Sequence, residues 1–299
     1  MSSITLDRVF THADATHETS ICWTTLGLET GPSLIFFHGT PWSSFCWTAY
    51  AQSLASRFRI YLFDLPGYGK SPGRTPSTGH GTEPDVTFAG LAAAFAHLYH
   101  SWGFSSTKPP HVVAHDIGGI VSLRAHLLHG CAYASLCLVD VVALRPFGSA
   151  FYQLVGRNSA VFNAVPAAIY EGMLDAYIKG AAYKPLPTKI AEALAAPWLA
   201  GGNQGQAGFV RQITQADERY VTEVEERYAE VGAVMPVKVI WGKEDTWIPV
   251  EQAVRLGKAL QAREVAIIDG AGHLIMFDQP EQLATELTLW LIQEAVDNV

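Results

Sequence analysis

The sequence predicts an α/β fold: a doubly wound, mostly parallel sheet with an inserted helical cap. Apolar runs of strand length alternate with helical patterns in the first half of the chain, and this alternation resumes near the end. Between the two parts, from residue 143 to residue 232, helical segments follow one another without a convincing strand. We therefore expect a core made of residues 1–142 and 233–299, and a cap made of residues 143–232.

The first part of the core begins with a predicted hairpin. Residues 4–10 and 20–26 are enriched in Thr, Ile, Val and Trp, which favour strands. Residues 33–37 form a continuous apolar run that suits a buried parallel strand. The elements that follow are, in order, a helix at 44–56, a strand at 59–63, a helix at 86–102, a strand and helix at 111–124, and a strand at 134–139.

The cap and the second part of the core continue this pattern. In the cap, apolar residues recur at helical spacing over 167–179 and 218–231, and prolines separate the segments. Strands that alternate with helices indicate parallel pairing through helical crossovers. After the cap, the sequence predicts strands at 237–241 and 264–268 and helices at 250–260 and 281–295.

Composition limits the classes of function. A chain of 299 residues with 49% hydrophobic and 16% charged residues can bury a large core and is globular. Its net charge of -8 argues against nucleic acid or an anionic membrane as the main partner. Residues 1–14 lack an apolar signal core, and no apolar run is long enough to span a bilayer, so we expect a soluble, cytoplasmic protein. The cysteines show no metal-ligand spacing, which predicts no metal site: Cys22, Cys46, Cys131 and Cys137.

A sharp turn between a strand and a helix is predicted within residues 111–124. Ala114, Gly118 and Gly119 are small, so the turn can be tight and the helix can approach the strand closely. Asp116, in the middle of the turn, is forced outward at a helix N-terminus, where an anion is stabilised. A carboxylate that attacks a saturated carbon forms an alkyl ester, which water can hydrolyse. Asp116 is therefore the candidate nucleophile.

Other polar residues follow the ends of the predicted parallel strands, where ligands bind in open sheets. They lie at residues 38–41, at Asp140, at 241–245 and at 270–273. With Asp116, they place a nucleophile, an acid and a histidine in the chain order of a catalytic triad. Over nearly its whole length the sequence resembles the α/β-hydrolase superfamily. Its aspartate at the nucleophile position resembles the branch that contains epoxide hydrolases and haloalkane dehalogenases.

This resemblance implies roles for several residues. His273 is the base that activates water against the ester, and Asp245 is the acid that orients it, since Trp-Gly-x-x-Asp matches epoxide hydrolases. Asp140 is the alternative acid, because some dehalogenases carry theirs at this point of the chain. The backbone N–H groups of Thr40 and Ile117 are expected to form the oxyanion hole. The expected reactants are a small apolar organic substrate and water, with no cofactor.

The leaving group is not fixed by these residues. Dehalogenases carry halide-binding Asn and Trp side chains where this sequence has Thr40 and Ile117. Epoxide hydrolases protonate the leaving oxygen with two cap tyrosines. Epoxide hydrolysis is the leading prediction, hydrolytic dehalogenation the alternative, and a non-hydrolytic or ligand-binding protein of the same fold stays open. The candidate substrate-binding residues are Tyr152 and Tyr170 for the first proton donor, Tyr220 for the second, and Trp42 and Trp247 as pocket walls.

Overall fold

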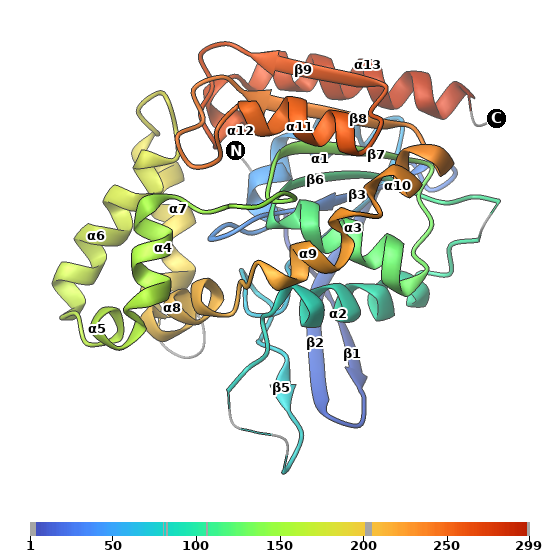
Figure 1. Cartoon of the computed structure of the whole chain (residues 1–299). Helices are drawn as coiled ribbons and strands as arrows, with labels where there is room; N and C mark the ends of the chain where they lie inside the picture. The colour runs from blue at the N-terminus through green and yellow to red at the C-terminus, as the bar shows by residue number, and fades with distance from the viewer. Residues whose placement is uncertain (1–3, 80, 82, 106, 201–204, 298–299) are drawn as a thin grey trace.

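The computed structural model describes residues 4–79, 81, 83–105, 107–200 and 205–297 (Figure 1). Within this part of the chain, nine strands form one mixed sheet in the order β1-β2-β4-β3-β6-β7-β8-β9, with β5 paired to β2. Pairing is parallel from β4 through β9 and antiparallel at β1, β2 and β5. The predicted α/β fold with a mostly parallel sheet is confirmed.

The strands agree closely with those predicted. Three of them, β3, β4 and β9, have the predicted bounds. The hairpin forms, but its first strand is shifted toward the turn and its second begins earlier than expected, because the Asp14 carboxylate accepts N–H bonds from Thr16 and His17 and thereby fixes a tight turn between Ala13 and His17. The strands are β1 Arg8–Ala13, β2 His17–Gly27, β3 Ser33–Phe37, β4 Arg59–Phe63, β5 Thr75–Pro76, β6 His111–Asp116, β7 Ser135–Val141, β8 Val237–Gly242 and β9 Glu264–Ile268.

The core helices pack against this sheet. The helix predicted over 44–56 is a short 3-10 turn, η1 Ser44–Trp47, followed by α1 Thr48–Leu54. Helix α3 contacts β6 and β7 and also packs against α2. In the described residues, no helix combines the length and the apolar character needed to cross a bilayer. The remaining core helices are α2 Phe88–Ser101, α3 Ile117–His129, α11 Glu251–Ala259, α12 Ile275–Asp278 and α13 Pro280–Asp297.

The helices and loops between β7 and β8 include no strand among the described residues. Helices α4 to α8 lie together to one side of the sheet, whereas α9 runs back beside α3 (Figure 1). The helix predicted over 218–231 is two, because the chain turns so that Tyr228 is buried and its hydroxyl donates to the Ala143 carbonyl at 2.6 Å. The helices are α4 Ala150–Arg157, α5 Ser159–Asn163, α6 Ala167–Gly180, α7 Thr188–Leu199, α8 Gln206–Thr214, α9 Arg219–Glu225 and α10 Tyr228–Val234.

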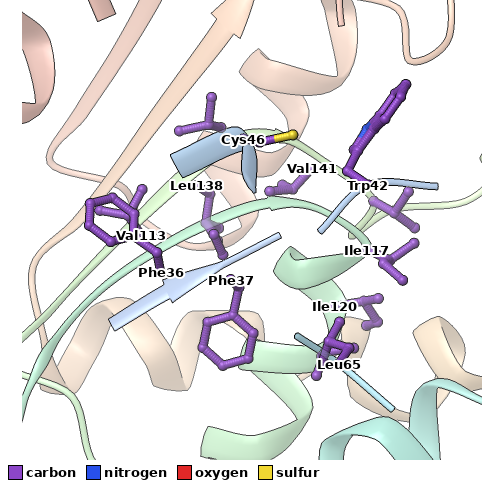
Figure 2. Packing of buried hydrophobic residues seen from close by; sticks show 14 of the residues in the cluster. Phe36, Phe37, Trp42, Cys46, Leu65, Val113, Ile117, Ile120, Leu138 and Val141 are labelled. Atoms are coloured by element: carbon purple, nitrogen blue, oxygen red, sulfur yellow. The ribbon is translucent and has the colours of Figure 1, made fainter. Parts of the chain in front are cut away.

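Buried side chains from neighbouring strands fix the positions of the strand ends. Phe37, Val113 and Leu138, from β3, β6 and β7, are fully buried, as is Ile120 on the facing side of α3 (Figure 2). Burying one such side chain contributes about 1.5–3 kcal/mol. Gly118 allows the close approach of α3, since a Cβ there would lie 2.8 Å from the Phe37 Cβ. This packing sets the turn between β6 and α3 against the loop after β3.

Candidate active site

Asp116 lies at the sharp turn between β6 and α3, as predicted. Its backbone has φ 50° and ψ -125°, a conformation that costs a residue other than glycine about 1–3 kcal/mol. The turn is crowded, because a Cβ on Gly39 would lie 2.3 Å from the Asp116 Cβ. The backbone therefore holds the carboxyl group at the N-terminus of α3, where the helix dipole favours a negative charge.

The structure brings Asp116, His273 and Asp245 together from the ends of three strands. The Nδ1 atom of His273 lies 2.9 Å from Oδ2 of Asp245, and its Nε2 lies 3.6 Å from Oδ2 of Asp116. All three side chains are buried. Asp245 is itself fixed, since its Oδ1 accepts N–H bonds from Trp247 at 2.7 Å and Ile248 at 2.9 Å. The imidazole is thus held between two carboxylates.

The two carboxylates change the proton affinity of His273. Burial alone lowers the pKa of His273, but the charges and hydrogen bonds of Asp245 and Asp116 outweigh it and raise the pKa well above its usual value. The imidazolium form is therefore favoured while Asp116 is ionised. If the Asp116 carboxylate were esterified, its charge would disappear and the pKa of His273 would fall.

Asp140, the alternative acid, does not contact the His273 ring. It is fully buried, and its Oδ1 accepts the Gly242 N–H at 2.7 Å. Its Oδ2 has no hydrogen-bond partner among the described residues. Burial and the neighbouring charge of Asp245 raise the pKa of Asp140 well above its usual range. Burial therefore favours the neutral form of Asp140, whereas Asp245 hydrogen-bonds His273.

The loop after β3 presents a backbone donor to Asp116. The Thr40 N–H lies 2.9 Å from Oδ2 of Asp116. Ile117, the first residue of α3, lines the same cavity, and the first N–H groups of a helix have no partner within the helix. The Thr40 N–H thus lies beside the carboxyl group, and Ile117 borders the same cavity. His38 supports the loop, because its Nε2 accepts the Leu65 N–H and its Nδ1 bonds the Gly39 carbonyl, each at 2.8 Å.

A small cavity is lined by Asp116 and His273. Its walls are mainly aromatic and aliphatic, which is typical of sites for small apolar ligands. No Lys or Arg is among the described lining residues. They are Thr40, Asp116, Ile117, Val142, Phe147, Gly148, Ser149, Tyr152, Tyr177, Trp247, Ile248 and His273.

The predicted pocket tryptophans lie one behind the other. Trp247 lines the cavity and stacks on the His273 ring, with centroids 5.1 Å apart. It also stacks on Tyr177 at 4.2 Å. Trp42 stacks on Trp247 at 5.8 Å and is buried outside the lining. Trp247 is therefore positioned to contact a ligand, and Trp42 supports Trp247 from behind.

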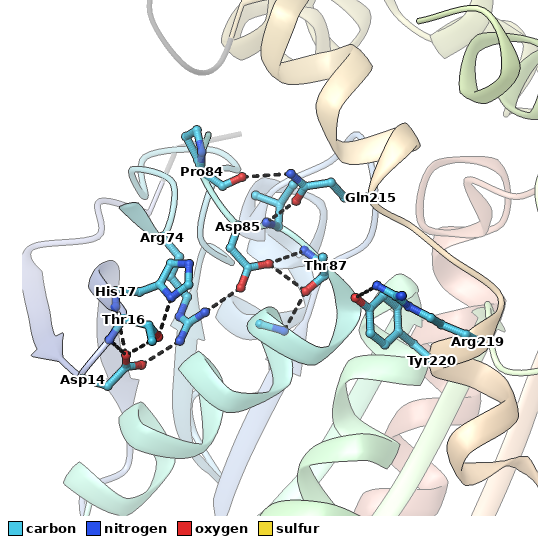
Figure 3. A network of polar contacts seen from close by, with 12 residues as sticks. Asp14, Thr16, His17, Arg74, Pro84, Asp85, Thr87, Gln215, Arg219 and Tyr220 are labelled. Carbon is cyan, nitrogen blue, oxygen red and sulfur yellow. Dashed lines mark hydrogen bonds and ion pairs between the residues drawn. The ribbon is translucent and has the colours of Figure 1, made fainter. Parts of the chain in front are cut away.

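The structure brings one of the three predicted tyrosines to the cavity and adds another. Tyr152 lines it, and its buried hydroxyl has no hydrogen-bond partner among the described residues. Tyr177 also lines it, and its hydroxyl is hydrogen-bonded to Ser149. Tyr170 instead donates to the Trp198 carbonyl at 3.3 Å. Tyr220 lies on α9 outside the lining, where its hydroxyl accepts a bond from Arg219 at 2.7 Å (Figure 3).

Sequence reasoning missed residues that hold the site in place. Glu244 accepts N–H bonds from Gly270 at 2.7 Å and Ala271 at 3.1 Å, which orders the loop before His273. His115 Nε2 donates to the His273 carbonyl at 2.9 Å. Neither has a motif of its own, although each is adjacent in sequence to a predicted triad residue. Among the described residues, no group of three or more His, Cys, Asp or Glu side chains is arranged to hold a metal ion.

The fold and this site define a class of protein. A doubly wound sheet places a strained turn residue, an acid and a histidine at its carboxyl edge, beside a backbone donor and a small cavity. This is the arrangement of an α/β-hydrolase enzyme.

Comparison with known proteins gives the family. The model of the alpha/beta hydrolase family matches residues 34–286, so the chain belongs to that family. An alpha/beta hydrolase fold protein from Burkholderia ambifaria has a solved structure with a TM-score of 0.84 and 37% identity, covering 95% of this chain and 97% of that one.

A structure that shares the fold and a protein of similar sequence are named for different activities. The haloalkane dehalogenase DbeA from Bradyrhizobium elkani has a TM-score of 0.74 at 18% identity, covering 97% of this chain and 100% of that one. The pimeloyl-[acyl-carrier protein] methyl ester esterase of Vibrio vulnificus is 26% identical, covering 90% of this chain and 97% of its own. Because proteins of this fold act on different substrates, the family alone does not identify the substrate of this chain, and the side chains of the site must indicate it.

Proposed function

We propose that this hydrolase opens small apolar epoxides through an ester on Asp116 that water then hydrolyses. The observation that carries the proposal is a carboxylate at the nucleophile position that shares one cavity with two phenol groups, those of Tyr152 and Tyr177. A serine that attacked a saturated carbon would form a stable ether, whereas a carboxylate forms an ester that can be released. The phenols supply the protons that an opening epoxide requires.

The first step forms the ester. Oδ2 of Asp116 is engaged by the Thr40 N–H, so Oδ1 is the oxygen that attacks the ring carbon. The carbon–oxygen bond of the ring breaks, and the released oxygen takes a proton from a cavity tyrosine. Burial, and then nearby groups that include Asp116, raise the pKa of Tyr152 and Tyr177 well above the usual value, so both stay protonated until the ring opens.

Esterification then prepares the base. Once Asp116 has lost its charge, the pKa of His273 falls, and the His273 proton can return to the tyrosinate. Neutral His273, oriented by Asp245, takes a proton from water as the water attacks the Asp116 carbonyl. The oxyanion on Oδ2 meets the N–H groups of Thr40 and Ile117. Collapse of the adduct breaks the ester, the Asp116 proton passes to the leaving alkoxide, and the diol and the starting charges are restored.

The site gives less support to dehalogenation. A departing halide needs N–H donors, but the Ile117 side chain has none, and the Thr40 hydroxyl already donates to Gln212. Dehalogenation and ligand binding without turnover are therefore kept as outcomes of the experiment. A small apolar organic molecule and water are the proposed reactants, and the cytoplasmic location stays a prediction.

Trapping the ester tests the proposal. The His273→Gln variant is incubated with styrene oxide, cyclohexene oxide, n-butyl bromide and p-nitrophenyl butyrate, and the intact protein is weighed by mass spectrometry. We expect an added mass equal to the whole epoxide, located on Asp116 by peptide mapping. The matched control is the same variant with Asp116→Ala, which should stay unmodified.

Each other result overturns the proposal. Labelling by n-butyl bromide alone indicates a dehalogenase, and an acyl adduct alone indicates an esterase. No adduct from any of the compounds, with wild-type protein also inactive, indicates a binding protein.

A second experiment uses the wild-type enzyme. A single turnover in isotopically labelled water should put solvent oxygen into the Asp116 carboxyl group.

A further inference from the structure

The loop that carries the Thr40 N–H is held by two helices of the predicted cap. Thr40 is buried, and its Oγ1 donates to Oε1 of Gln212 at 2.5 Å, across 172 residues of sequence. Gln212 belongs to α8 and is 3% exposed. Beside it, the Trp198 Nε1–H of α7 donates to the Pro41 carbonyl at 2.6 Å. Thr40 and Pro41, in the loop beside Asp116, are thus each hydrogen-bonded to a helix of the predicted cap.

A core residue completes this contact from the other side. Tyr68 also interacts with the Thr40 side chain. Tyr68 is almost fully buried and its ring packs against the ring of Trp198, with centroids 5.8 Å apart.

Small movements of this loop matter because it lies against the nucleophile. A Cβ at Gly39 would collide with the Asp116 side chain, so the loop is already in contact with it. The N–H of Thr40 must meet the ester oxygen at hydrogen-bond distance when charge develops there, and a donor that is displaced by a fraction of an ångström stabilises that charge less.

We propose that Gln212 is a positioning residue for the oxyanion hole, acting through the Thr40 hydroxyl. The cap then does more than enclose the cavity, because its contact with Thr40 sets the backbone donor that the second chemical step requires. This inference rests on the proposed function, since it concerns hydrolysis of the Asp116 ester. If Gln212 has this role, its loss should slow hydrolysis of the Asp116 ester and leave formation of the ester almost unchanged.

The test separates the two steps. Gln212→Leu removes the acceptor with little change in volume, and Thr40→Val removes the hydroxyl but keeps the backbone N–H. With whichever epoxide of the panel labels Asp116 fastest, rapid-quench mass spectrometry follows ester formation and loss. We expect ester hydrolysis to slow by about 10–100-fold, less than the loss of a whole oxyanion donor. Ester formation should change by less than about threefold, so the ester should accumulate. The double variant should be no worse than either single one, because both changes break the same contact.

Gln215→Leu is the matched control. Gln215 is the residue that caps the C-terminus of the same helix, and it also ties this helix to the core, accepting the Val86 N–H at 2.7 Å and donating to the Pro84 carbonyl at 3.0 Å (Figure 3). It should lower thermal stability to a similar extent as Gln212→Leu without accumulating ester.

Failure of this inference can be told from failure of the proposed function. If Gln212→Leu and Gln215→Leu hydrolyse the ester equally fast, or if Gln212→Leu slows both steps alike, then Gln212 is only a structural contact and the inference is wrong. If no epoxide labels Asp116 even in His273→Gln, the proposed function itself is wrong.

Discussion

The core loops and the cap helices contribute to one cavity, but they hold their side chains in different ways. In the core, Asp116 is fixed by a strained turn and Asp245 by two backbone N–H groups. In the predicted cap, Tyr152 and Tyr177 reach the cavity and Gln212 reaches Thr40 through the way the helices pack on the core and on one another. The core supplies the charged groups, and the cap supplies neutral donors and acceptors.

This difference suggests a division of labour. In the proposed function, the core groups make and break bonds to carbon, so their loss should stop turnover. The proposed roles of the cap groups are to protonate the leaving oxygen and to position the Thr40 N–H, so their loss should slow one chemical step and leave the other unchanged. Four predictions test this division, beginning with the largest expected effect.

Replacing the nucleophile should have the largest effect. Asp116→Ala removes the atom that bonds to carbon, and we expect kcat/KM for the best epoxide to fall by at least about 10⁴-fold. Steady-state diol formation and intact-protein mass spectrometry measure it. A loss of less than tenfold would show that Asp116 is not the nucleophile, and the proposed division of roles between core and cap residues would be wrong.

The two buried acids should differ sharply. Asp245→Asn removes the partner that orients His273, and kcat should fall by about 10³–10⁴-fold. Asp140→Asn should lower kcat by less than about threefold, because the His273 ring is hydrogen-bonded to Asp245 and not to Asp140, and the new amide oxygen can still accept the Gly242 N–H. Equal losses, with both variants folded by circular dichroism, would assign the orienting role to both acids.

The cavity tyrosines should act on ester formation alone. Tyr152→Phe and Tyr177→Phe should each slow the first step by about 10–100-fold, since the two phenols share the proton donation. Ester hydrolysis should be unchanged in single-turnover experiments. Tyr170→Phe and Tyr220→Phe are the controls, because their side chains lie outside the cavity, and both should stay within about twofold of wild type. If the controls were as slow as the cavity variants, the role of the cavity phenols would be rejected.

The smallest effect concerns stability and pH. The folded pKa of His273 is raised, so the imidazolium contributes stability that is fully present below the unfolded value of about 6.5 and is lost as the pH rises through the folded pKa. The free energy of unfolding, measured in urea, should therefore decline from about pH 6 toward pH 9 in wild type and less steeply in His273→Gln. If the free energy of unfolding depended on pH in the same way in both proteins, the His273 imidazolium would not be stabilised by Asp245 and Asp116, and the prediction would be wrong.

Local patterns were enough to predict the core part of the site. Small residues at Ala114, Gly118 and Gly119 indicated the turn, and strand ends placed Asp116, Asp245 and His273 at one edge of the sheet. These signals lie within a few residues of the side chains that they position. The structure brings these three side chains together, and it favours Asp245 over Asp140 as the partner of His273.

The cap could not be predicted to the same extent. Tyr170 and Tyr177 are seven residues apart on α6 and therefore lie near the same helical face, yet only Tyr177 reaches the cavity. Tyr220 was assigned to the site and lies on α9, away from it. Helical periodicity predicts which face is buried but not which neighbour it meets.

The sequence by itself determined the sheet, the turn at Asp116 and the identity of the residues at the strand ends, because backbone geometry there depends on neighbouring residues. Only the tertiary structure decided which tyrosines face the cavity and that Gln212 bonds Thr40, because these contacts depend on how helices dock across 172 residues of chain. Docking follows from the summed packing of many side chains, and no short segment carries that information.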